Sequence, residues 1–436
     1  MKKILFVLIF ALSILMLVSC SKDKSETDSY ETVTLTVYNW GEYISDGFQG
    51  SFDTNAEFEK YFNKNLAVKY GVKVKVVYTT YPTNEDMFEK IKSGAGSYDI
   101  VFPSDYMIEK MIEEDMLLSY DVAADIENFK YIEDQFKGNY YDPENRYSVP
   151  YTYGMLGVIY NKELVDKEDY DKQSWELLWN DKYKGKILQF NNQRDAFATA
   201  MYALGLDVNS TDTAVWNTAL EKMSAQKPLV QAYVNDEIFN KMTTASAAIA
   251  PYFAGDFITM ADLNEDLDFY YPKEGTNVFY DAMCILKDSK NPEIAKEYIN
   301  YMLSEEPAIA NATYIGYASP NTLVKNNEGY KEEMGARAIS LLYGISPESV
   351  NAEYNSKYET ASYKMFSKDM QSHVNTLWES LKTENATEPW IHISTALIVG
   401  SVVALAGYNI YIKKKRSRDY RIRDKQKRLA AKANKH

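Results

Sequence analysis

Acidic side chains stand next to aromatic rings at two places in this chain of 436 residues. The first is Asn39-Trp40-Gly41-Glu42-Tyr43, and the second is Pro103-Ser104-Asp105-Tyr106. A carboxylate can form a salt bridge with an ammonium group, while a ring face attracts the same positive charge and covers the methylenes beside it. The two segments therefore favour an organic cation as the ligand.

A further acid, Asp281, lies within the apolar stretch of residues 278–286. A buried carboxylate without a partner is costly. We therefore expect Asp281 to meet a cation or hydrogen-bond donors in the folded protein.

Side chains that commonly perform catalysis are scarce. The chain has two cysteines, Cys20 and Cys284, and three histidines, of which His373 alone falls between the two terminal apolar segments. The spacings typical of zinc sites, phosphate-binding loops and dinucleotide-binding loops do not occur. We expect no metal site, no cofactor and no enzymatic activity, and a hydrolase would have to depend on His373.

Strands and helices that alternate over residues 32–114 are expected to position the two acidic motifs. This order predicts an α/β fold with a right-handed, mainly parallel sheet, whose ligands sit beyond the carboxyl ends of the strands. A capping box at Thr54 and Glu57 predicts a helix start, and Ser104 is a predicted helix cap. Hydrophobic periodicity predicts strands at 32–39, 72–78, 98–102 and 147–160, and helices at 54–61, 84–92, 104–114, 175–179, 196–203, 213–224, 292–303 and 365–381.

The amino terminus is typical of an exported lipoprotein. Lys2 and Lys3 precede the apolar run 4–18, which ends in Leu17-Val18-Ser19-Cys20 and resembles a bacterial lipobox. We therefore predict a signal peptide over residues 1–20, lipidation of Cys20 and a tether over residues 21–30.

A second apolar segment, 391–412, contains 22 residues without a formal charge. At about 1.5 Å per residue, it is long enough to cross a hydrocarbon core of roughly 30 Å. Basic residues follow at once, which predicts a transmembrane helix over 391–412 and a cytoplasmic tail over 413–436. Both termini then place the folded part outside the cytoplasm, at the cell membrane.

The formal net charge is −14, although residues 413–436 carry twelve Lys or Arg and two Asp. The rest of the chain is thus strongly acidic. This distribution argues against a nucleic-acid partner, which would require a basic face.

Motifs in a fixed order over residues 32–385 resemble the spermidine/putrescine-binding proteins of polyamine ABC transporters, a branch of the extracytoplasmic solute-binding proteins. The matching segments include Val37-Tyr-Asn-Trp-Gly-Glu-Tyr-Ile44, Tyr98-Asp-Ile-Val-Phe-Pro-Ser-Asp-Tyr106, Tyr147-Ser-Val-Pro-Tyr151, Val278-Phe-Tyr-Asp281 and Ile315-Gly-Tyr-Ala-Ser-Pro-Asn321. The segment 358–370 diverges from the family.

The resemblance implies a periplasmic-binding-protein-like fold with two lobes, a ligand cleft and a hinge. Lobe 1 would contain residues 31–153 and 280–324, and lobe 2 residues 154–279 and 325–388. The protein would be a monomer that captures putrescine or spermidine and delivers it to ABC permease subunits with a cytoplasmic ATPase.

The resemblance also implies the residues that line the cleft. They are the aromatic residues Trp40, Tyr43, Tyr106, Tyr252, Phe279 and Tyr317, the acids Glu42, Asp195 and Asp281, and the polar residue Ser104. Asn192 stands where the family tends to carry another acid. The missing charge favours a shorter diamine or a different arrangement of the end group.

Two other binding functions stay open at the level of sequence. Ferric ion could be held by tyrosinates, because Tyr140-Tyr141 and Tyr270-Tyr271 occur as pairs. A signalling receptor could use the membrane segment and the basic tail.

Overall fold

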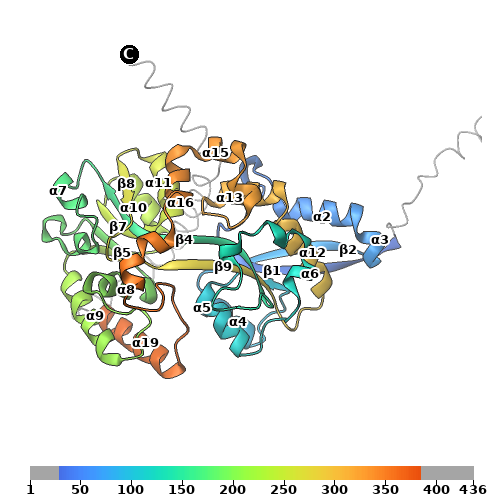
Figure 1. Cartoon of the computed structure of the whole chain (residues 1–436), viewed down its shortest axis with the longest axis horizontal. Helices are drawn as coiled ribbons and strands as arrows, with labels where there is room; N and C mark the ends of the chain where they lie inside the picture. Colours follow the sequence, from blue (N-terminus) through green and yellow to red (C-terminus); the bar gives the residue numbers. More distant parts are fainter. Residues whose placement is uncertain (1–28, 384–436) are drawn as a thin grey trace, which may run out of the picture.

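Within residues 29–383, which the computed structural model describes, nine strands form one mixed sheet (Figure 1). Their order is β2-β1-β3-β9-β4-β7-β5-β6, and β8 pairs with β4. The strands are β1 (Glu31–Trp40), β2 (Val72–Tyr81), β3 (Ile100–Val101), β4 (Ser148–Asn161), β5 (Ile187–Phe190), β6 (Val230–Val234), β7 (Ile249–Phe253), β8 (Leu267–Tyr270) and β9 (Val278–Ile285).

The first half of the sheet is built on the alternating sequence of β1. Leu35 and Val37 enter one hydrophobic core, while Tyr38 enters another. Both faces are therefore covered, as in a sheet with helices on each side. The predicted strands at 32–39 and 72–78 are confirmed, and the segment 98–102 forms a strand only at its centre.

Helix starts in this half differ from the prediction in one respect. Asp53, not Thr54, caps α2 (Thr54–Asn65), and its Oδ1 accepts the Ala56 N–H at 2.9 Å. The Thr54 hydroxyl is buried and donates to Asn311 instead, so it is not free to cap the helix. Helix α4 (Asn84–Lys92) has the predicted bounds, and α5 (Asp105–Glu113) follows Ser104.

The two strands β4 and β9 run between the halves and pair with each other antiparallel. Strand β9 is also antiparallel to β3, and β4 is antiparallel to β7 and β8. The expected parallel pairing is confirmed for β1, β2 and β3, the strands from which it was predicted, whereas the whole sheet is mixed. Parallel pairing holds at the two sides, between β1 and its neighbours and between β5 and its neighbours.

Separate hydrophobic cores lie on the two sides of these crossing strands. One contains β5, β7 and the helices α8 and α9, with Trp175 and Trp216 among its largest buried side chains. The other side has two clusters that share β1 and β9. Only β4 and β9 among the strands continue from one side to the other, and Figure 1 shows them crossing the centre of the molecule.

The other helices cover the faces of the sheet. They are α3 (Ala67–Tyr70), α6 (Val122–Asp125), α7 (Lys167–Tyr170), α8 (Gln193–Leu204), α9 (Thr213–Gln226), α10 (Glu237–Thr243), α11 (Ala254–Leu263), α12 (Pro292–Met302), α13 (Glu305–Ile315), α14 (Thr322–Lys325), α15 (Glu328–Met334), α16 (Ala336–Tyr343), α17 (Pro347–Val350), α18 (Ala352–Asn355) and α19 (Lys368–Thr383). Short 3-10 helices occur at η2 (Phe48–Gly50), η3 (Glu127–Tyr131), η4 (Asp134–Phe136), η5 (Trp175–Trp179) and η6 (Asp181–Tyr183).

None of the helices between residues 29 and 383 is long and apolar enough to cross a membrane. The predicted signal peptide with Cys20, the predicted membrane helix 391–412 and the basic tail lie outside the described residues.

Candidate ligand-binding site

The loop after β1 holds two of the predicted site residues in fixed positions. The Trp40 indole N–H donates to the carbonyl oxygen of Phe102 at 2.8 Å, and its ring centroid lies 4.8 Å from that of Tyr81. Glu42 is half-buried and has a φ of 56°, in the left-handed region. This conformation costs a non-glycine residue about 1–3 kcal/mol and is often found at ligand sites.

Asp281 is the buried centre of the first group of predicted residues. Its side chain is 5% exposed, and its Oδ2 accepts the Tyr43 hydroxyl at 2.5 Å. The same hydroxyl lies 2.5 Å from Thr152 Oγ1, and Ser104 forms an isolated β-bridge with Asp281. Burial raises the pKa of Asp281 to about 6, against hydrogen bonds from Tyr43 and Ser104 that lower it.

Aromatic rings continue from Tyr43 toward the other half of the molecule. The Tyr317 centroid lies 5.8 Å from Tyr43 and 5.7 Å from Phe279. Phe253 follows at 5.4 Å from Phe279, and Tyr252 at 5.2 Å from Phe253. These distances are those of ordinary aromatic pairs, so the rings form a continuous wall.

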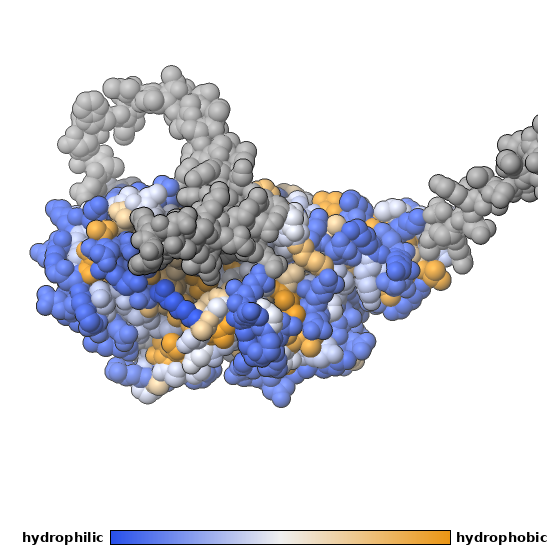
Figure 2. Space-filling model, turned by 90° about the horizontal axis from the view of Figure 1, so that it is seen from above, coloured by the Kyte–Doolittle hydropathy of each residue, from blue (hydrophilic) through white to orange (hydrophobic). Residues whose placement is uncertain are grey.

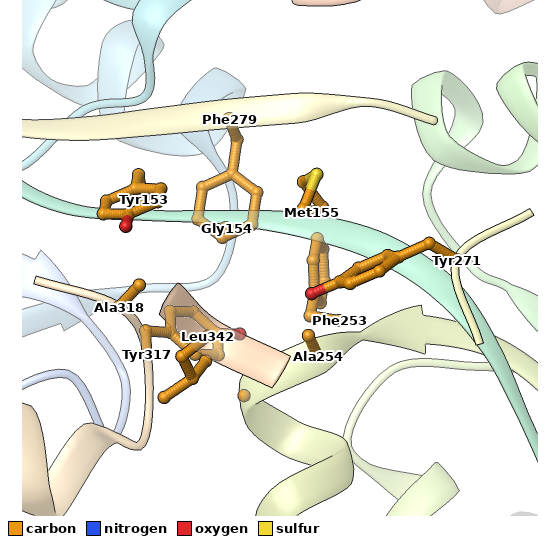
Figure 3. Close-up of a pocket in the computed structure, with 11 residues that line it drawn as sticks. Tyr153, Gly154, Met155, Phe253, Ala254, Tyr271, Phe279, Tyr317, Ala318 and Leu342 are labelled. Carbon is orange, nitrogen blue, oxygen red and sulfur yellow. The ribbon is translucent and has the colours of Figure 1, made fainter. Parts of the chain in front are cut away.

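A small hollow lies against this wall (Figure 3). Phe279 points from β9 across β4 toward Tyr317 and Leu342. The position of its ring requires a glycine at 154, because a Cβ there would lie 2.6 Å from Phe279 Cζ.

Asp256 is an acid near this wall that sequence reasoning missed. It lies in the first turn of α11, is half-buried, and its Oδ2 accepts the Tyr317 hydroxyl at 2.7 Å. Gly255 allows this contact, since a Cβ at 255 would overlap the Tyr317 ring. Its place four residues after Tyr252, a predicted cleft residue, is the sequence feature that could have indicated Asp256.

A second group lies at the start of α8. Asn192 is exposed and caps this helix, and its Oδ1 accepts the Arg194 N–H at 2.9 Å and the Asp195 N–H at 3.4 Å. Asp195 is buried, and its Oδ1 accepts the Tyr363 hydroxyl at 2.9 Å. Burial raises the pKa of Asp195 to about 6, while Tyr363 and Arg194 lower it.

Arg194 is a second functional candidate that sequence reasoning missed. Its guanidinium is buried, 3.9 Å from the ring centroid of Phe366, 4.5 Å from that of Tyr363 and 5.9 Å from that of Tyr106. The Tyr106 hydroxyl donates to Glu85 at 3.0 Å. Arg194 therefore links α8 to the beginning of α5 through cation–π contact.

The predicted residues thus fall into two groups and some neighbours. Tyr43, Ser104, Phe279, Asp281 and Tyr317 come together, and Tyr252 joins them through Phe253. Tyr106 and Asp195 meet around Arg194. Trp40 and Glu42 contact Phe102 and Tyr314, respectively, and Asn192 serves as a helix cap.

The tyrosine pairs do not favour a ferric site. The Tyr140 hydroxyl donates to the carbonyl oxygen of Tyr363, and the Tyr270 hydroxyl to that of Ser174. Burial raises the pKa of all four tyrosines, Tyr271 and Tyr141 included, which opposes the tyrosinate form. Within residues 29–383, no cluster of three or more His, Cys, Asp or Glu could hold a metal ion.

Comparison with known proteins now defines the class. Residues 56–338 match the model of the bacterial extracellular solute-binding proteins, and the chain belongs to this family. The α/β periplasmic-binding-protein-like fold expected from the sequence is confirmed, and its sheet is mixed.

Several relatives of this chain have names that state polyamine binding. The chain is 31% identical over 289 residues to the spermidine/putrescine-binding periplasmic protein of Escherichia coli, covering 66% of this chain and 78% of that protein. It is 28% identical to the putrescine/cadaverine-binding protein of Pseudomonas aeruginosa, covering 66% and 79%. Among solved structures, a spermidine/putrescine ABC transporter substrate-binding protein of Streptococcus pneumoniae is similar, with 31% identity, a TM-score of 0.62 and coverage of 80% and 98%.

Proposed function

We propose that this protein is the extracytoplasmic substrate-binding component of a polyamine ABC importer. It binds putrescine or spermidine and performs no catalysis, in agreement with its family. The observation that carries this function is the buried carboxylate of Asp281, held by Tyr43 beside the rings of Phe279 and Tyr317.

Each part of a polyamine has a counterpart in this arrangement. An ammonium group forms a charge-assisted hydrogen bond with Asp281, and the rings attract its charge. The methylenes lie against Phe279 and Tyr317, whose faces exclude water. Glu42 and Asp256 are half-buried acids near the same wall, and they suit the opposite amine.

Cleft closure is the proposed mechanism of capture. Strands β4 and β9 connect the two proposed lobes, residues 31–153 with 280–324 and residues 154–279 with 325–388, and act as the hinge. A ligand that contacts both lobes stabilises the closed form and shifts the population toward it. The closed form then presents the polyamine to permease subunits with a cytoplasmic ATPase.

The proposal includes attachment to the cell membrane. A lipid on Cys20 and a helix over 391–412 would hold residues 21–390 outside the cytoplasm, and the basic tail would remain inside. The sequence pattern at both ends supports this arrangement.

Isothermal titration calorimetry of the purified protein tests the function. Putrescine, cadaverine, spermidine and spermine are titrated in turn, with amino acids as controls. We expect heat and a thermal shift with at least one polyamine and none with amino acids. The absence of binding to every polyamine would refute the proposal.

A further inference from the structure

Two carboxylates on adjacent segments each have one buried oxygen without a hydrogen-bond partner of good geometry among the described residues. These oxygens are Oδ2 of Asp105 and Oδ1 of Asp281. Asp105 is 1% exposed and follows Ser104, which forms the β-bridge with Asp281. Buried polar atoms almost always have a partner, and a buried carboxylate without one is costly. The pair of oxygens therefore indicates a missing donor.

Uncharged donors surround the two carboxylates: the Ser104 hydroxyl faces Asp281, and the backbone N–H groups of Tyr280 and Tyr106 face Asp105. Asp105 Oδ1 accepts the Tyr106 N–H at 2.8 Å. The titratable and charged groups that influence or adjoin it are Asp281 and Tyr280 from β9, Arg194 from α8, and Tyr140 and Tyr141 from the loop before β4. Burial raises the pKa of Asp105, and Asp281 raises it further, whereas Arg194 lowers it.

Arg194 is engaged elsewhere. Its guanidinium nitrogens donate to the Lys364 carbonyl at 3.4 Å and to Asn209 Oδ1 at 3.5 Å, and its face lies on Phe366 and Tyr363. Arg194 thus lies near three buried or half-buried acids, namely Glu85, Asp105 and Asp195. The carboxylates in this region outnumber the single guanidinium, so a further cation would be attracted there.

We propose that Asp105 is a second amine-binding carboxylate, which together with Asp281 holds one ammonium group of the ligand. This inference rests on the proposed polyamine function. Asp105 supplies the negative charge that Asn192 lacks, from α5 instead of α8. An ammonium group carries several N–H donors on one nitrogen, so it can serve both unpartnered oxygens at once.

The geometry also specifies the kind of cation. Both open positions are hydrogen-bond acceptors, so the site requires N–H donors and takes a primary or secondary ammonium. A quaternary ammonium has the same charge and no N–H. The site is therefore expected to bind putrescine more tightly than the derivative in which both amines carry three methyl groups.

Calorimetry on the full-length protein in detergent tests this assignment with Asp105→Asn, which keeps the shape and removes the charge. Glu113→Gln is the matched control, because it removes one charge from an exposed position of the same helix. We expect Asp105→Asn to weaken putrescine binding at least about tenfold, and Glu113→Gln to leave it within about twofold. The doubly trimethylated putrescine should bind wild type at least about tenfold more weakly than putrescine.

The thermal midpoint of the ligand-free protein separates binding from a structural role. Removing a buried unpaired charge is expected to keep or raise this midpoint. A lower midpoint with unchanged affinity would overturn the assignment, as would unchanged affinity alone. Asp105→Glu displaces the carboxylate while keeping its charge, and it should also weaken binding. This variant tests the assignment if Asp105→Asn does not fold. If wild type binds no polyamine, the proposed function itself fails; if wild type binds and both Asp105 variants bind equally well, this inference alone fails.

Discussion

At the scale of single residues, the buried acids of the site oppose folding and favour binding. Asp195 and Asp281 are shielded from water, and burial raises the pKa of each to about 6 from an ordinary value of 3.8. Each carboxylate is thus harder to ionise in the folded protein than in the unfolded chain. A bound ammonium reverses this cost, because it interacts with the ionised form.

The stability of the ligand-free protein and its affinity for putrescine should therefore change in opposite directions with pH. Because the folded-state pKa values are raised, the contribution of Asp195 and Asp281 to the stability of the ligand-free protein is present below about pH 4 and is lost as pH rises through about 6. Putrescine affinity should instead rise over the same interval, as Asp281 becomes ionised. Thermal unfolding and calorimetry at pH 5, 6 and 7 measure the two trends. An affinity that falls from pH 5 to pH 7 would contradict the prediction.

Replacing Asp281 by asparagine tests the central contact. The change leaves the volume unchanged and removes the charge that pairs with the amine. A hydrogen bond to a charged group contributes about 1.5–3 kcal/mol, so putrescine affinity should fall about tenfold or more. Asp288→Asn, at an exposed position after the same strand, is the control and should bind as wild type does. Equal affinities of the two variants would remove Asp281 from the site.

At the scale of elements, close approach of the two halves depends on a glycine. The Tyr317 ring lies on the backbone of Gly255 at the start of α11, and a Cβ there would overlap ring atoms Cδ1 and Cε1. Tyr317 would have to turn away, which would break its hydrogen bond with Asp256.

We therefore expect Gly255→Ala to weaken polyamine binding by about tenfold, because well-packed sites relax poorly around an added methyl group and overpacking costs about 1–3 kcal/mol. The control is Gly41→Ala in the loop after β1, where an added Cβ meets nothing within 4 Å. Calorimetry with putrescine measures both variants. Wild-type affinity of Gly255→Ala would show that this contact is not needed for binding.

The elements also show what local sequence can predict. The strands β1 and β2 and helix α4 follow from alternating or helical hydrophobic patterns, which are local. The direction of β4 and β9 depends on how two halves of the chain meet, so the predicted parallel pairing holds for β1, β2 and β3 and does not extend across the centre of the sheet. The same limit applies to Arg194, because its ring partners Tyr363 and Phe366 lie far along the chain.

The helix caps illustrate a related limit. Thr54 and Asp53 are both good N-caps by type, and the choice between them depends on Asn311, which lies far along the chain. In α8, the exposed side chain of Asn192 caps the helix, which the sequence comparison at this position did not indicate. The apolar strand around Asp281 marked this acid as costly to bury alone, and the structure gives it the Tyr43 hydroxyl as a hydrogen-bond donor.

At the scale of the whole molecule, the halves touch through a few directed contacts beside β4 and β9. The Met365 N–H donates to Glu109 Oε2 at 3.0 Å, and the Tyr140 hydroxyl donates to the Tyr363 carbonyl at 2.5 Å. Figure 2 shows a mostly hydrophilic surface over the described residues, with apolar residues in the middle of the face. Contacts of this kind can break and re-form, as the proposed cleft closure requires.

The distribution of charge over the whole chain leads to the last prediction. Apart from the basic tail, the chain is strongly acidic, and a field of one sign raises the local concentration of small cations. The Debye length falls from about 30 Å at 0.01 M salt to about 10 Å at 0.1 M, so the association rate of putrescine should fall as salt is added. Contacts buried in the site are screened much less, so the dissociation rate should change little. Stopped-flow measurement of intrinsic fluorescence on wild type and Asp281→Asn separates the two effects: both proteins should share the salt dependence of association, and the variant should differ by faster dissociation. An association rate that is independent of salt would assign the acidic surface to solubility instead of ligand capture.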